Sequence, residues 1–469
     1  MAEINTQIEE IKSLLSSEEI ITPASPEYIE QSVTWAAQCN KKPRVVVRPK
    51  TLQTLGKIIA RLNESSLDIG IRCTGVGNAS AKDVLVSMSE FKSFSFNPDD
   101  ESITFGAGHN WGEIDRKVEE LAPGYAAVSA RCTYVGVGGS ILSGGQSWLS
   151  SEYGLSSDPQ NMLDAQVVKM DGSVTWAGEE PDLLWALRGG GGGFAVVTAY
   201  KMRVYKYPSA IFTGQVVYPP EALRDVAREV AAFASRCRDP KMALHLYCLD
   251  MTQGTYAGKE AKPGLAIFAY DAHGEEHGRS DKGFKWALDI KGAVDMTKCL
   301  NHRGVNEQFD ALKSTMGMTN TWAAGVTVPS VDQELILRAW EWYLDLLKKD
   351  PRLVRGTYVL MEVMQKAAYQ SLGFPSKVSA WPHTLHQHNL QIGTGTPPGS
   401  AESDALAYKA MAEGPYQIRP GHTGADYFPN FMESFVDPKQ VFGVNGDKLV
   451  EIKKKYDPNN KLGGPFGRN

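Results

Sequence analysis

Two clusters of glycine constrain this chain more than any other feature of its sequence. The first runs from Val135 to Gly145, and the second runs from Gly189 to Gly193. Glycine lets backbone N–H groups approach a phosphate closely and lets the chain adopt positive φ angles. Two such loops suit a dinucleotide with a pyrophosphate. For either run taken alone, the alternative interpretation is a flexible loop.

Other nucleotide-binding motifs fit the sequence poorly. The dinucleotide-binding fingerprint of doubly wound folds requires an acidic residue about 20 residues after the glycines, at the end of a strand, and neither cluster has one. No Gly-Lys-Ser/Thr run occurs, so the phosphate loop of nucleotide triphosphatases is absent. These two observations count against nicotinamide and nucleoside triphosphate cofactors.

Composition and charge narrow the class of protein. The chain has 469 residues, 42% of them hydrophobic, which predicts a globular protein of two or three domains that needs no metal or disulfide for stability. A net charge of −5 without a run of basic residues argues against nucleic-acid and membrane partners. The N-terminus does not resemble a secretory signal, and no stretch approaches the ~20 apolar residues of a membrane span. Six cysteines without a CxxC motif favour reduced thiols and a cytoplasmic location.

The N-terminal half alternates strand and helix patterns. An amphipathic segment is expected over residues 1–20. Apolar strands are predicted at 44–47, 67–72, 83–88 and 102–106, with a helix at 51–63 whose leucines and isoleucines recur at helical spacing. This order is typical of a small βαβ unit. Strands at 166–170 and 173–177 flank Asp171-Gly172, which predicts a tight hairpin.

The segment from about 210 to 420 has a different pattern. Helices are predicted at 220–237 and 331–349, and strands at 243–249, 264–270, 356–363 and 385–392. Several strands separated by a few helices indicate an α+β domain with an antiparallel sheet. A last helix is predicted at 446–456, ended by Asp457-Pro458.

Several short motifs together resemble one family. They are Cys132-Thr-Tyr-Val-Gly-Val-Gly-Gly139, Tyr153-Gly-Leu-Ser-Ser-Asp158, residues 167–172, residues 182–190, Phe442-Gly-Val-Asn445 and residues 455–460. In type and order they resemble the berberine-bridge-enzyme-like branch of the vanillyl-alcohol-oxidase flavoprotein superfamily, especially its fungal members. The resemblance covers about 43–207 and 420–462, and it is weak between them.

The resemblance implies FAD as cofactor and an α+β fold. A two-lobed FAD-binding domain of the vanillyl-alcohol-oxidase type would be joined to an α+β substrate domain built on an antiparallel sheet. The implied boundaries are an N-terminal arm at 1–42, the FAD-binding lobes at 43–207, the substrate domain at 208–420 and a C-terminal segment at 421–469 that completes the FAD domain.

The resemblance also implies which residues hold FAD. The turn after Arg72 and the loop from Val135 would hold the pyrophosphate, Val196 or Val197 would bind the adenine through the backbone, and Asn430 and Asn445 would lie near the flavin. The full expected set is Arg72, Thr74, Gly75, Val76, Gly77, Asn78, Ala79, Cys132, Val135, Gly136, Gly138, Gly139, Ser140, Gly144, Gly145, Tyr153, Gly154, Asp158, Gly192, Val196, Asn430 and Asn445.

The chain departs from the family at positions that matter for chemistry. Many relatives carry a histidine that bonds to a flavin methyl carbon, whereas Val76 or Asn78 stands there in this chain. Cys132 occupies the place of a cysteine that some relatives attach to the flavin ring, although an inert buried thiol is the alternative. Relatives carry Tyr-x-Asn-Tyr near the C-terminus, whereas this chain has Phe428-Pro-Asn-Phe431, so both phenols are missing.

Acid–base groups are expected on two strands of the substrate domain. Residues 383–391 hold three histidines, and alternation places His386 and His388 on one face and Asn389 and Gln391 on the other. Which face meets the flavin stays open, as do a solvated or core histidine cluster and a metal site, although no third metal ligand is evident. Glu362 lies among apolar residues, so it is expected either to be paired or to have a raised pKa.

The sequence therefore predicts an enzyme, an FAD-linked oxidoreductase. It would oxidise a small organic molecule, in secondary-metabolite biosynthesis, by hydride transfer to flavin with molecular oxygen as acceptor. His386 or His388 would take the proton, and Val135 favours oxygen reactivity, because relatives with a small residue there leave a path to the ring. The alternative is a non-redox isomerase or pericyclase that keeps an oxidised flavin as a wall of its pocket.

Overall fold

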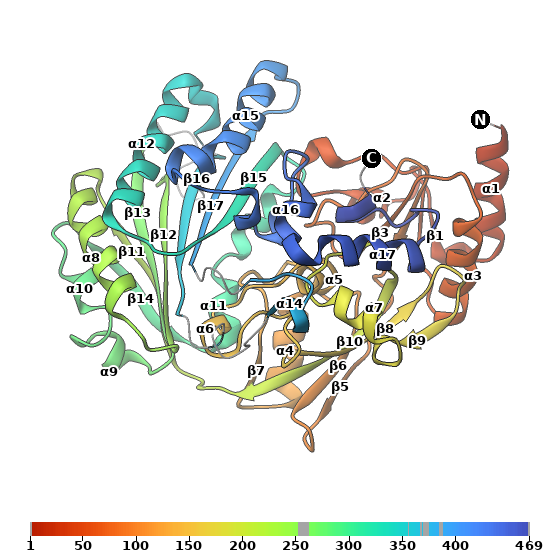
Figure 1. Ribbon diagram of the computed structural model, residues 1–469, viewed down its shortest axis with the longest axis horizontal. Coiled ribbons are helices and arrows are strands. Elements are labelled where there is room, and N and C mark those ends of the chain that lie inside the picture. The colour runs from red at the N-terminus through yellow and green to blue at the C-terminus, as the bar shows by residue number, and fades with distance from the viewer. Residues whose placement is uncertain are drawn as a thin grey trace.

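The computed structural model describes residues 2–251, 262–354, 356–365, 368, 375–383 and 388–467, which form three β-sheets and their covering helices. Figure 1 shows the largest sheet on the left with helices outside it, and two smaller sheets to the right and below. The α+β class predicted from the sequence is confirmed.

The first small sheet follows the predicted βαβ order. Strands β2 (Val45–Val47), β4 (Val84–Ser87) and β3 (Ile69–Arg72) run parallel, and β1 (Ile20–Ile21) pairs antiparallel with β2 at the edge. Helix α3 (Leu52–Asn63) connects β2 to β3 and begins at Thr51, whose hydroxyl accepts a hydrogen bond from the Thr54 amide at 3.1 Å. Its apolar stripe is fully buried, as the helical spacing predicted.

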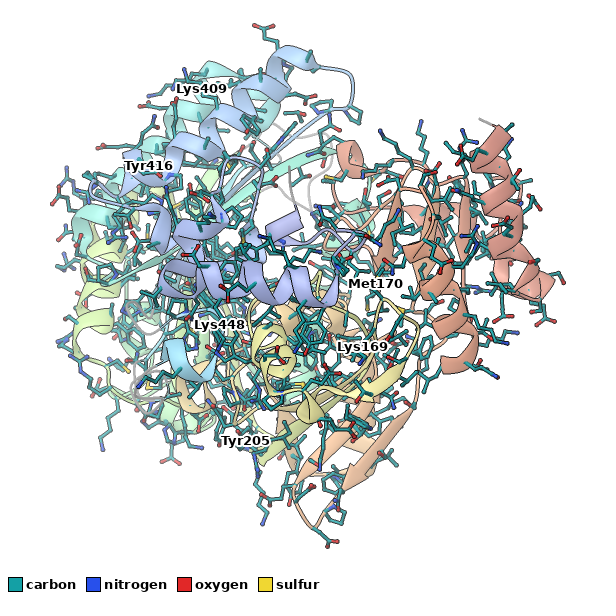
Figure 2. All side chains as sticks on the ribbon, turned by 45° about the vertical axis from the view of Figure 1, so that its right-hand side comes forward. Lys169, Met170, Tyr205, Lys409, Tyr416 and Lys448 are labelled. Atoms are coloured by element: carbon teal, nitrogen blue, oxygen red, sulfur yellow. The ribbon has the colours of Figure 1, made fainter. Side chains whose placement is uncertain are left out.

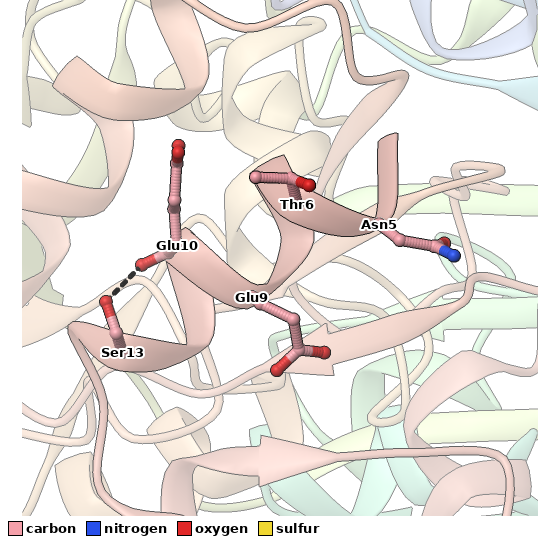
Figure 3. A pocket seen from close by; sticks show the side chains of 5 residues that line it. All are labelled: Asn5, Thr6, Glu9, Glu10 and Ser13. Carbon is pink, nitrogen blue, oxygen red and sulfur yellow. Dashed lines mark hydrogen bonds between the residues drawn. The ribbon is translucent and has the colours of Figure 1, made fainter. Parts of the chain in front are cut away.

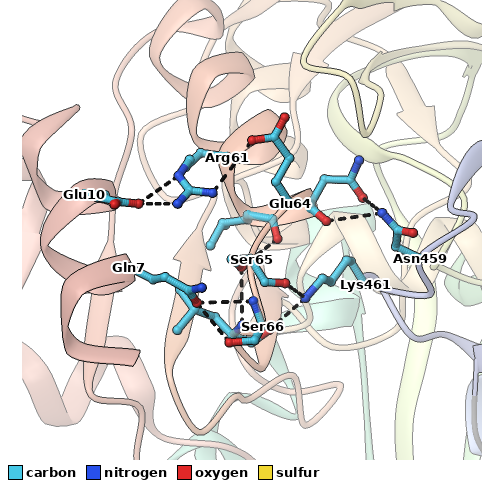
Figure 4. A network of polar contacts seen from close by, with 11 residues as sticks. Gln7, Glu10, Arg61, Glu64, Ser65, Ser66, Asn459 and Lys461 are labelled. Carbon is cyan, nitrogen blue, oxygen red and sulfur yellow. Dashed lines mark hydrogen bonds and ion pairs between the residues drawn. The ribbon is translucent and has the colours of Figure 1, made fainter. Parts of the chain in front are cut away.

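Both ends of the chain meet at the C-terminal end of α3. Helix α1 (Ala2–Ser13) buries Ile8 and Ile11 in the same core as α3, so the N-terminal segment is part of the first lobe. The polar contacts drawn in Figure 4 include Glu10 with Arg61, Gln7 with Ser66, Asn459 with Asn63, and Lys461 with Ser65. The last two link the end of the chain to the lobe that begins it.

The second small sheet carries the glycine-rich helix. Its strand order is β5 (Phe94–Asn97), β6 (Ser102–Gly106), β10 (Val196–Lys206), β8 (Met162–Val168) and β9 (Val174–Trp176), and β7 (Tyr125–Ala127) pairs with the end of β10. The predicted hairpin at Asp171-Gly172 joins β8 to β9. Helix α4 (Trp111–Leu121) begins with a capping box between Asn110 and Glu113, and α5 (Val137–Leu142) occupies the first glycine cluster.

The largest sheet is antiparallel throughout. Its order is β14 (Val294–Leu300), β11 (Ile211–Tyr218), β13 (Pro263–Asp271), β12 (Met242–Asp250), β16 (Tyr358–Val363), β17 (His388–Thr396) and β15 (Asn320–Val328). All four strands predicted in this region are present. The sheet places β12, β16 and β17 near its middle, so residues of three chain segments meet on one face.

The two faces of this sheet differ in polarity. Helices α8 (Leu223–Arg236), α12 (Gln333–Lys349) and α15 (Ala401–Ile418) pack with side chains such as Leu246, Met361 and Leu390, which form an apolar core. Because neighbouring residues of a strand point to opposite faces, His245, Glu362 and Asn389 lie on the other face. That polar face is turned away from these three helices.

The C-terminal segment returns to the two small sheets, residues 43–207, for which the resemblance implies FAD binding and which are called the FAD-binding part below. Helices α16 (Pro438–Phe442) and α17 (Gly446–Tyr456) lie across the middle of Figure 1, beside α7 (Pro181–Leu187). Lys448, labelled near the centre of Figure 2, holds its ammonium 3.7 Å from the centroid of the Trp185 ring. The hydroxyl of Tyr456 donates to carboxylates near the start of α7. These contacts join chain ends that are far apart in sequence.

Candidate active site

Glu362 lies at the centre of the polar face of the large sheet. Its side chain is fully buried and contacts three donors. Gln391 on the next strand donates from Nε2 to Oε1 at 2.5 Å, and Asn389 donates from Nδ2 to Oε2 at 3.1 Å. The third donor is Arg131, which forms an ion pair with Oε1. Burial raises the pKa of Glu362, and Arg131 and the two amides act in the opposite direction.

Arg131 reaches this carboxylate from the FAD-binding part. It lies in the loop between β7 and α5, and its Nη1 also donates to Nε2 of His245 at 2.9 Å. His245 is opposite Glu362 in the β12–β16 register and stacks on Trp148 with ring centroids 4.0 Å apart. Burial lowers the pKa of His245 well below its usual value, so this imidazole is the neutral acceptor for Arg131.

The register settles which residues of β17 belong to the site. Glu362 is paired with Asn389, and Gln391 lies two residues further along the same face. Asn389 also donates to Oε1 of Gln146, which brings in the residue directly after the first glycine cluster. Asn389 and Gln391, both named from the sequence, therefore meet Glu362 at one point.

The histidines of the 383–391 segment do not meet there. His388 follows the opposite parity, and its Nδ1 accepts a hydrogen bond from the Met364 amide at 3.1 Å. His383 lies with Nε2 2.7 Å from Oδ1 of Asp158. His386 lies outside the described residues. The structure thus brings Glu362, and not His388, to the face that contacts the FAD-binding part.

The loop that carries Arg131 brings a thiol and a phenol to the same place. Cys132 and Tyr134 lie two residues apart in this loop, and Tyr134 stacks on Trp35 with ring centroids 5.4 Å apart at 7°. Burial raises the pKa of the Cys132 thiol, and the Tyr134 hydroxyl and Arg131 act in the opposite direction. The thiol and the carboxylate of Glu362 influence each other electrostatically.

Two further phenols line this face of the sheet. Tyr247 is two residues from His245 on β12, and Tyr358 is four residues from Glu362 on β16. The ring of Tyr358 lies across Gly393 of the neighbouring strand, where a Cβ would come within 2.3 Å of it. Burial raises the pKa of Tyr358 to about 12, with Glu362 adding to the effect. The site is therefore rich in phenols although Phe428 and Phe431 lack them.

Helix α5 connects the glycine-rich loops. A Cβ at Gly136 would come within 2.6 Å of Cys73 Sγ and 2.8 Å of Thr74 Oγ1, so the loop before α5 packs directly on the turn that follows β3. The other end of α5 accepts a hydrogen bond from the Gly191 amide at the Leu142 carbonyl. Residues 72–80, 135–145 and 189–193 are thus brought together around one short helix.

Glycines in each of these loops border open space. A Cβ placed on Gly77, Gly139 or Gly192 would meet nothing within 4 Å, whereas most other glycines of the loops are in tight contact. Val196 lies at the start of β10, before the pairing with β6 begins at Ala199, and its side chain is buried in the core with Val168 and Met170. Room beside glycine backbone is what a dinucleotide needs.

Some side chains of the expected FAD set bind protein instead. Arg72 donates to the carbonyls of Glu30 and Thr74 at 3.0 and 2.9 Å, and burial lowers the pKa of its guanidinium to about 10. Asn78 has φ +61° and accepts from the Ala36 amide at 2.8 Å. These side chains fix the shape of the 72–80 turn, which leaves its backbone to face a ligand.

Ser140 and the Tyr153–Asp158 turn also have structural contacts. The Ser140 hydroxyl accepts from Trp111 Nε1 at 2.8 Å, and Tyr153 stacks on Tyr205 at 3.8 Å. Gly154 has φ +82°, and a Cβ there would lie 2.4 Å from Oδ2 of Asp158. Asp158 in turn accepts from the Leu155 amide at 2.7 Å, so this carboxylate holds its own turn.

The C-terminal Phe-Pro-Asn-Phe run packs on glycine backbone from both domains. Phe428 lies over Gly144, Asn430 accepts from the Gly145 amide at 3.1 Å, and Phe431 lies over Gly325 of β15. Gly325 is opposite Gln391, so the Phe431 ring borders the polar face beside the site. The two phenylalanines therefore pack beside the first glycine-rich loop and the polar sheet face, and neither provides a hydroxyl.

The second glycine cluster mainly allows close packing of chain segments. A Cβ at Gly191 would come within 2.8 Å of Pro465, and one at Gly193 within 2.5 Å of the Gly463 carbonyl. Asn445 donates to the Ala380 carbonyl at 2.9 Å and is buried. This cluster is therefore a junction between the FAD-binding part and the C-terminal segment, with open space only at Gly192.

Other surface features carry less chemistry. The hollow drawn in Figure 3 is lined by Asn5, Thr6, Glu9, Glu10 and Ser13, all from helix α1 and remote in the fold from Glu362. Within the described ranges, no group of three or more His, Cys, Asp or Glu is arranged to hold a metal ion. In that same part of the chain, no helix combines the length and the apolar character needed to cross a membrane.

Comparisons with known proteins relate both the glycine-rich loops and the C-terminal segment to flavoproteins. Residues 43–178 match the family model described as an FAD binding domain, and residues 427–462 match the one described as berberine and berberine like. The chain is 24% identical to the FAD-linked oxidoreductase aurO of Gibberella zeae over 99% of its own length and 88% of that protein. An uncharacterized FAD-linked oxidoreductase of Arthroderma benhamiae is 27% identical over 50% of this chain, and the match spans 48% of that relative's length.

Solved structures share the fold over nearly the whole chain. The BBE-like 1 protein of Physcomitrella patens superposes with a TM-score of 0.80 at 17% identity, covering 98% of both chains. A berberine bridge enzyme variant in complex with (S)-reticuline gives 0.79 at 14% identity, covering 99% of this chain and 98% of the other. The chain therefore shares its fold with these proteins, and its two matched stretches, residues 43–178 and 427–462, resemble berberine-bridge-enzyme-like FAD-linked oxidoreductases.

Sequence reasoning missed several residues of the site. Arg131, His245, Gln146 and the three tyrosines at 134, 247 and 358 were not named. Arg131 is directly before the motif that begins at Cys132, and Tyr358 shares a strand face with Glu362 at a spacing of four. Those two positions offered a signal, whereas Gln146 and His245 offered none.

Proposed function

We propose that this protein oxidises a small organic molecule at the face of the large sheet that carries Glu362, with FAD as the acceptor of a hydride. The observation that carries the proposal is the buried Glu362 carboxylate, held by three donors and directed at the loop from the FAD-binding part. A buried carboxylate on the sheet face that contacts the neighbouring domain is suited to proton transfer.

The FAD would be held by backbone and glycine. The 72–80 turn, the α5 loop and Gly192 offer the room that a dinucleotide fills, at Gly77, Gly139 and Gly192. When bound, FAD supplies the redox chemistry, because its ring accepts a hydride from a substrate C–H bond. The protein's own groups bind and orient the substrate and move the proton.

Glu362 is assigned as the proton acceptor in place of the histidines. Its carboxylate takes the proton from the substrate group next to the reacting carbon, and Arg131 and Gln391 hold its oxygens in place. Burial raises the pKa of Glu362, which makes the carboxylate a better base. Tyr247 and Tyr358 offer aromatic surface and hydroxyls to a substrate on the same face.

Molecular oxygen is proposed as the final electron acceptor. Val135 is the small residue at the position that relatives use to leave oxygen a path, and it is only partly buried. Structures with this fold include a xylooligosaccharide oxidase of Myceliophthora thermophila in complex with xylobiose, with a TM-score of 0.77. The fold is thus compatible with an oxidase.

A second candidate function is a non-redox isomerisation or pericyclic reaction beside an oxidised flavin. The observation that favours it is the replacement of both phenols by Phe428 and Phe431, whose rings pack on Gly144 and Gly325. Under this alternative, Glu362 would protonate or deprotonate the substrate and the flavin would serve as a wall.

One experiment separates the two functions. The purified yellow protein is mixed without oxygen with a panel of phenols, alcohols and amines, and the visible flavin absorbance is followed. An oxidase should bleach with its substrate and consume oxygen when air is admitted. Conversion of a compound with the flavin still oxidised, and with no oxygen consumed, would replace oxidation by the second candidate.

A further inference from the structure

The loop between β7 and α5 is held by the substrate domain on both sides of Cys132. Ser129 and Thr133 lie three residues before and one residue after that cysteine, and both are buried. Their partners come from α11 (His302–Glu307) and the 3-10 helix η5 (Asp310–Thr315) of the substrate domain.

Three residues spaced by four make these contacts. Asn306 donates from Nδ2 to the Ser129 hydroxyl at 3.2 Å, and Nε2 of His302 lies 2.9 Å from the same hydroxyl. Asp310 accepts a hydrogen bond from the Thr133 hydroxyl. These three residues, His302, Asn306 and Asp310, are called the positioning face. They hydrogen-bond to the loop at Ser129 and at Thr133. Arg131 lies between these two loop residues and forms the ion pair with Glu362.

Helix α4 of the FAD-binding part also takes part in the contact between Asn306 and Ser129. Asn306 donates to Oδ2 of Asp115 at 2.9 Å from the same amide nitrogen that contacts Ser129. Asp115, Ser129 and Asn306 are all buried, so each lost hydrogen bond would leave a polar group without compensation by water. The arrangement therefore allows one loop position and disfavours others.

We propose that the positioning face of α11 and η5 sets the loop that carries Arg131 and Cys132, and thereby holds both side chains in register with Glu362 and the flavin ring. The catalytic role of this positioning rests on the proposed function, whereas the hydrogen bonds to Ser129 and Thr133 can be tested without a substrate. Its members are positioning residues, since they act through Arg131 and Cys132 and do not touch the reacting atoms.

The alternative is that these contacts only stabilise the interface between the two domains. Arg303, on the same helix, makes an interdomain ion pair with Glu119 of α4 at 2.8 Å and a second ion pair with Glu307 of its own helix at 3.7 Å. If the contacts only stabilise the interface, replacing Arg303 should have the same effect as replacing Asn306. If the contacts position the loop, only the loss of the hydrogen bonds to the Ser129 and Thr133 hydroxyls should change the loop. Arg303→Ala is therefore the matched control.

The test uses the FAD-loaded protein and two measurements. Hydrogen exchange of the amides at 129–136 reports the loop, and the visible circular dichroism of the flavin reports its surroundings. Thr133→Val removes the bond to Asp310 at nearly constant volume, whereas Thr133→Ser keeps the hydroxyl. Asn306→Ala removes the hydrogen bond to Ser129. If that variant does not fold, the result for Thr133→Val alone tests the proposal.

Thr133→Val and Asn306→Ala should raise loop exchange about 10-fold and change the flavin dichroism, while α8 and α12, which do not carry these partners, exchange as in the wild type. Thr133→Ser and Arg303→Ala should match the wild type in both measurements. Unchanged exchange in Thr133→Val would overturn the proposal, as would faster exchange without a change in the flavin signal. An equal effect of Arg303→Ala would assign the contacts to domain adhesion. Absence of oxidase activity would not alter any of these results.

Discussion

The guanidinium of Arg131 in the FAD-binding part forms an ion pair with the carboxylate of Glu362 in the middle of the substrate-domain sheet. Their side chains are 15% and 0% exposed, so water does little to solvate the pair. A buried pair is tolerated when hydrogen bonds satisfy the remaining atoms, and His245, Asn389 and Gln391 provide them. The reactive groups of one domain therefore depend on the placement of the other.

Replacing Glu362 should abolish most turnover while the protein stays folded. Glu362→Gln keeps the size of the side chain and removes the base, so kcat should fall roughly 10²-fold or more. His388→Asn is the matched control, because an amide oxygen can replace Nδ1 as acceptor for the Met364 amide. Near-normal turnover in Glu362→Gln, together with a loss in His388→Asn, would return the role of base to the histidines.

Removing Arg131 alone should destabilise the protein. Arg131→Met leaves the Glu362 carboxylate buried without its cation, which costs about 3–5 kcal/mol of unfolding free energy. The double variant Arg131→Met with Glu362→Gln should recover part of that loss, since no charge is then left unpaired. Urea denaturation of the two single variants and the double variant measures the coupling. Additive losses would show that the pair contributes no net interaction.

The strand that carries Asn389 and Gln391 shows where sequence reasoning ended. Every residue of β17 is buried, because one face meets the helices and the other meets the FAD-binding part. Residues 389–392 alternate between polar and apolar side chains, but when both faces of a strand are buried the alternation does not say which face meets the FAD-binding part. The strand itself could be predicted, but its parity required the register with Glu362.

Other features were recoverable to different degrees. Helix α3 and its neighbouring strands follow from periodicity, and the expectation that Glu362 is paired or has a raised pKa is met in both respects. The partner Arg131 could not be derived, because it lies in a loop without periodicity and its contact spans two domains. The residue type of the glycine run at 189–193 suits a dinucleotide or a flexible loop, and only the structure shows that most of its contacts are with the C-terminal segment, with open space at Gly192.

Filling the open space beside α5 should expel the cofactor but not unfold the chain. A Cβ at Gly139 meets no atom of the protein within 4 Å, so Gly139→Val should be accommodated by the cofactor-free fold. If FAD occupies that space, the variant should purify colourless, with the melting temperature of the wild-type apoprotein. Purification of a yellow Gly139→Val protein with normal FAD content would place the cofactor elsewhere.

The flavin should be released by acid. No histidine is available at Val76, and burial raises the pKa of Cys132, which keeps the thiol neutral and less nucleophilic. Trichloroacetic acid should therefore leave a yellow supernatant and a colourless pellet. Retention of flavin in the wild-type pellet, with release in Cys132→Ala, would instead establish a cysteinyl bond. Retention in both proteins would contradict the alignment of this loop with the family.

The buried Asp115–His302 pair should give two opposing pH dependences of stability. Burial raises the pKa of Asp115 to about 7, and burial lowers the pKa of His302 to about 4. The stability from Asp115 is present at low pH and is lost as pH rises from about 4 to 7. The stability from His302 is present above about pH 6.5 and is lost as pH falls toward 4. In the wild type the two effects largely cancel over this window.

Single variants should uncover each effect. Asp115→Asn mimics the protonated acid and leaves His302, so unfolding free energy should rise between pH 4 and 6.5, by up to about 1.4 kcal/mol per pH unit. His302→Gln leaves Asp115, whose charge faces Ser129, Asn306, Arg303 and Glu307, so stability should fall over a similar range. Urea denaturation at half-unit pH steps measures both slopes. Slopes of equal sign in the two variants would show that these groups do not titrate as the buried site requires.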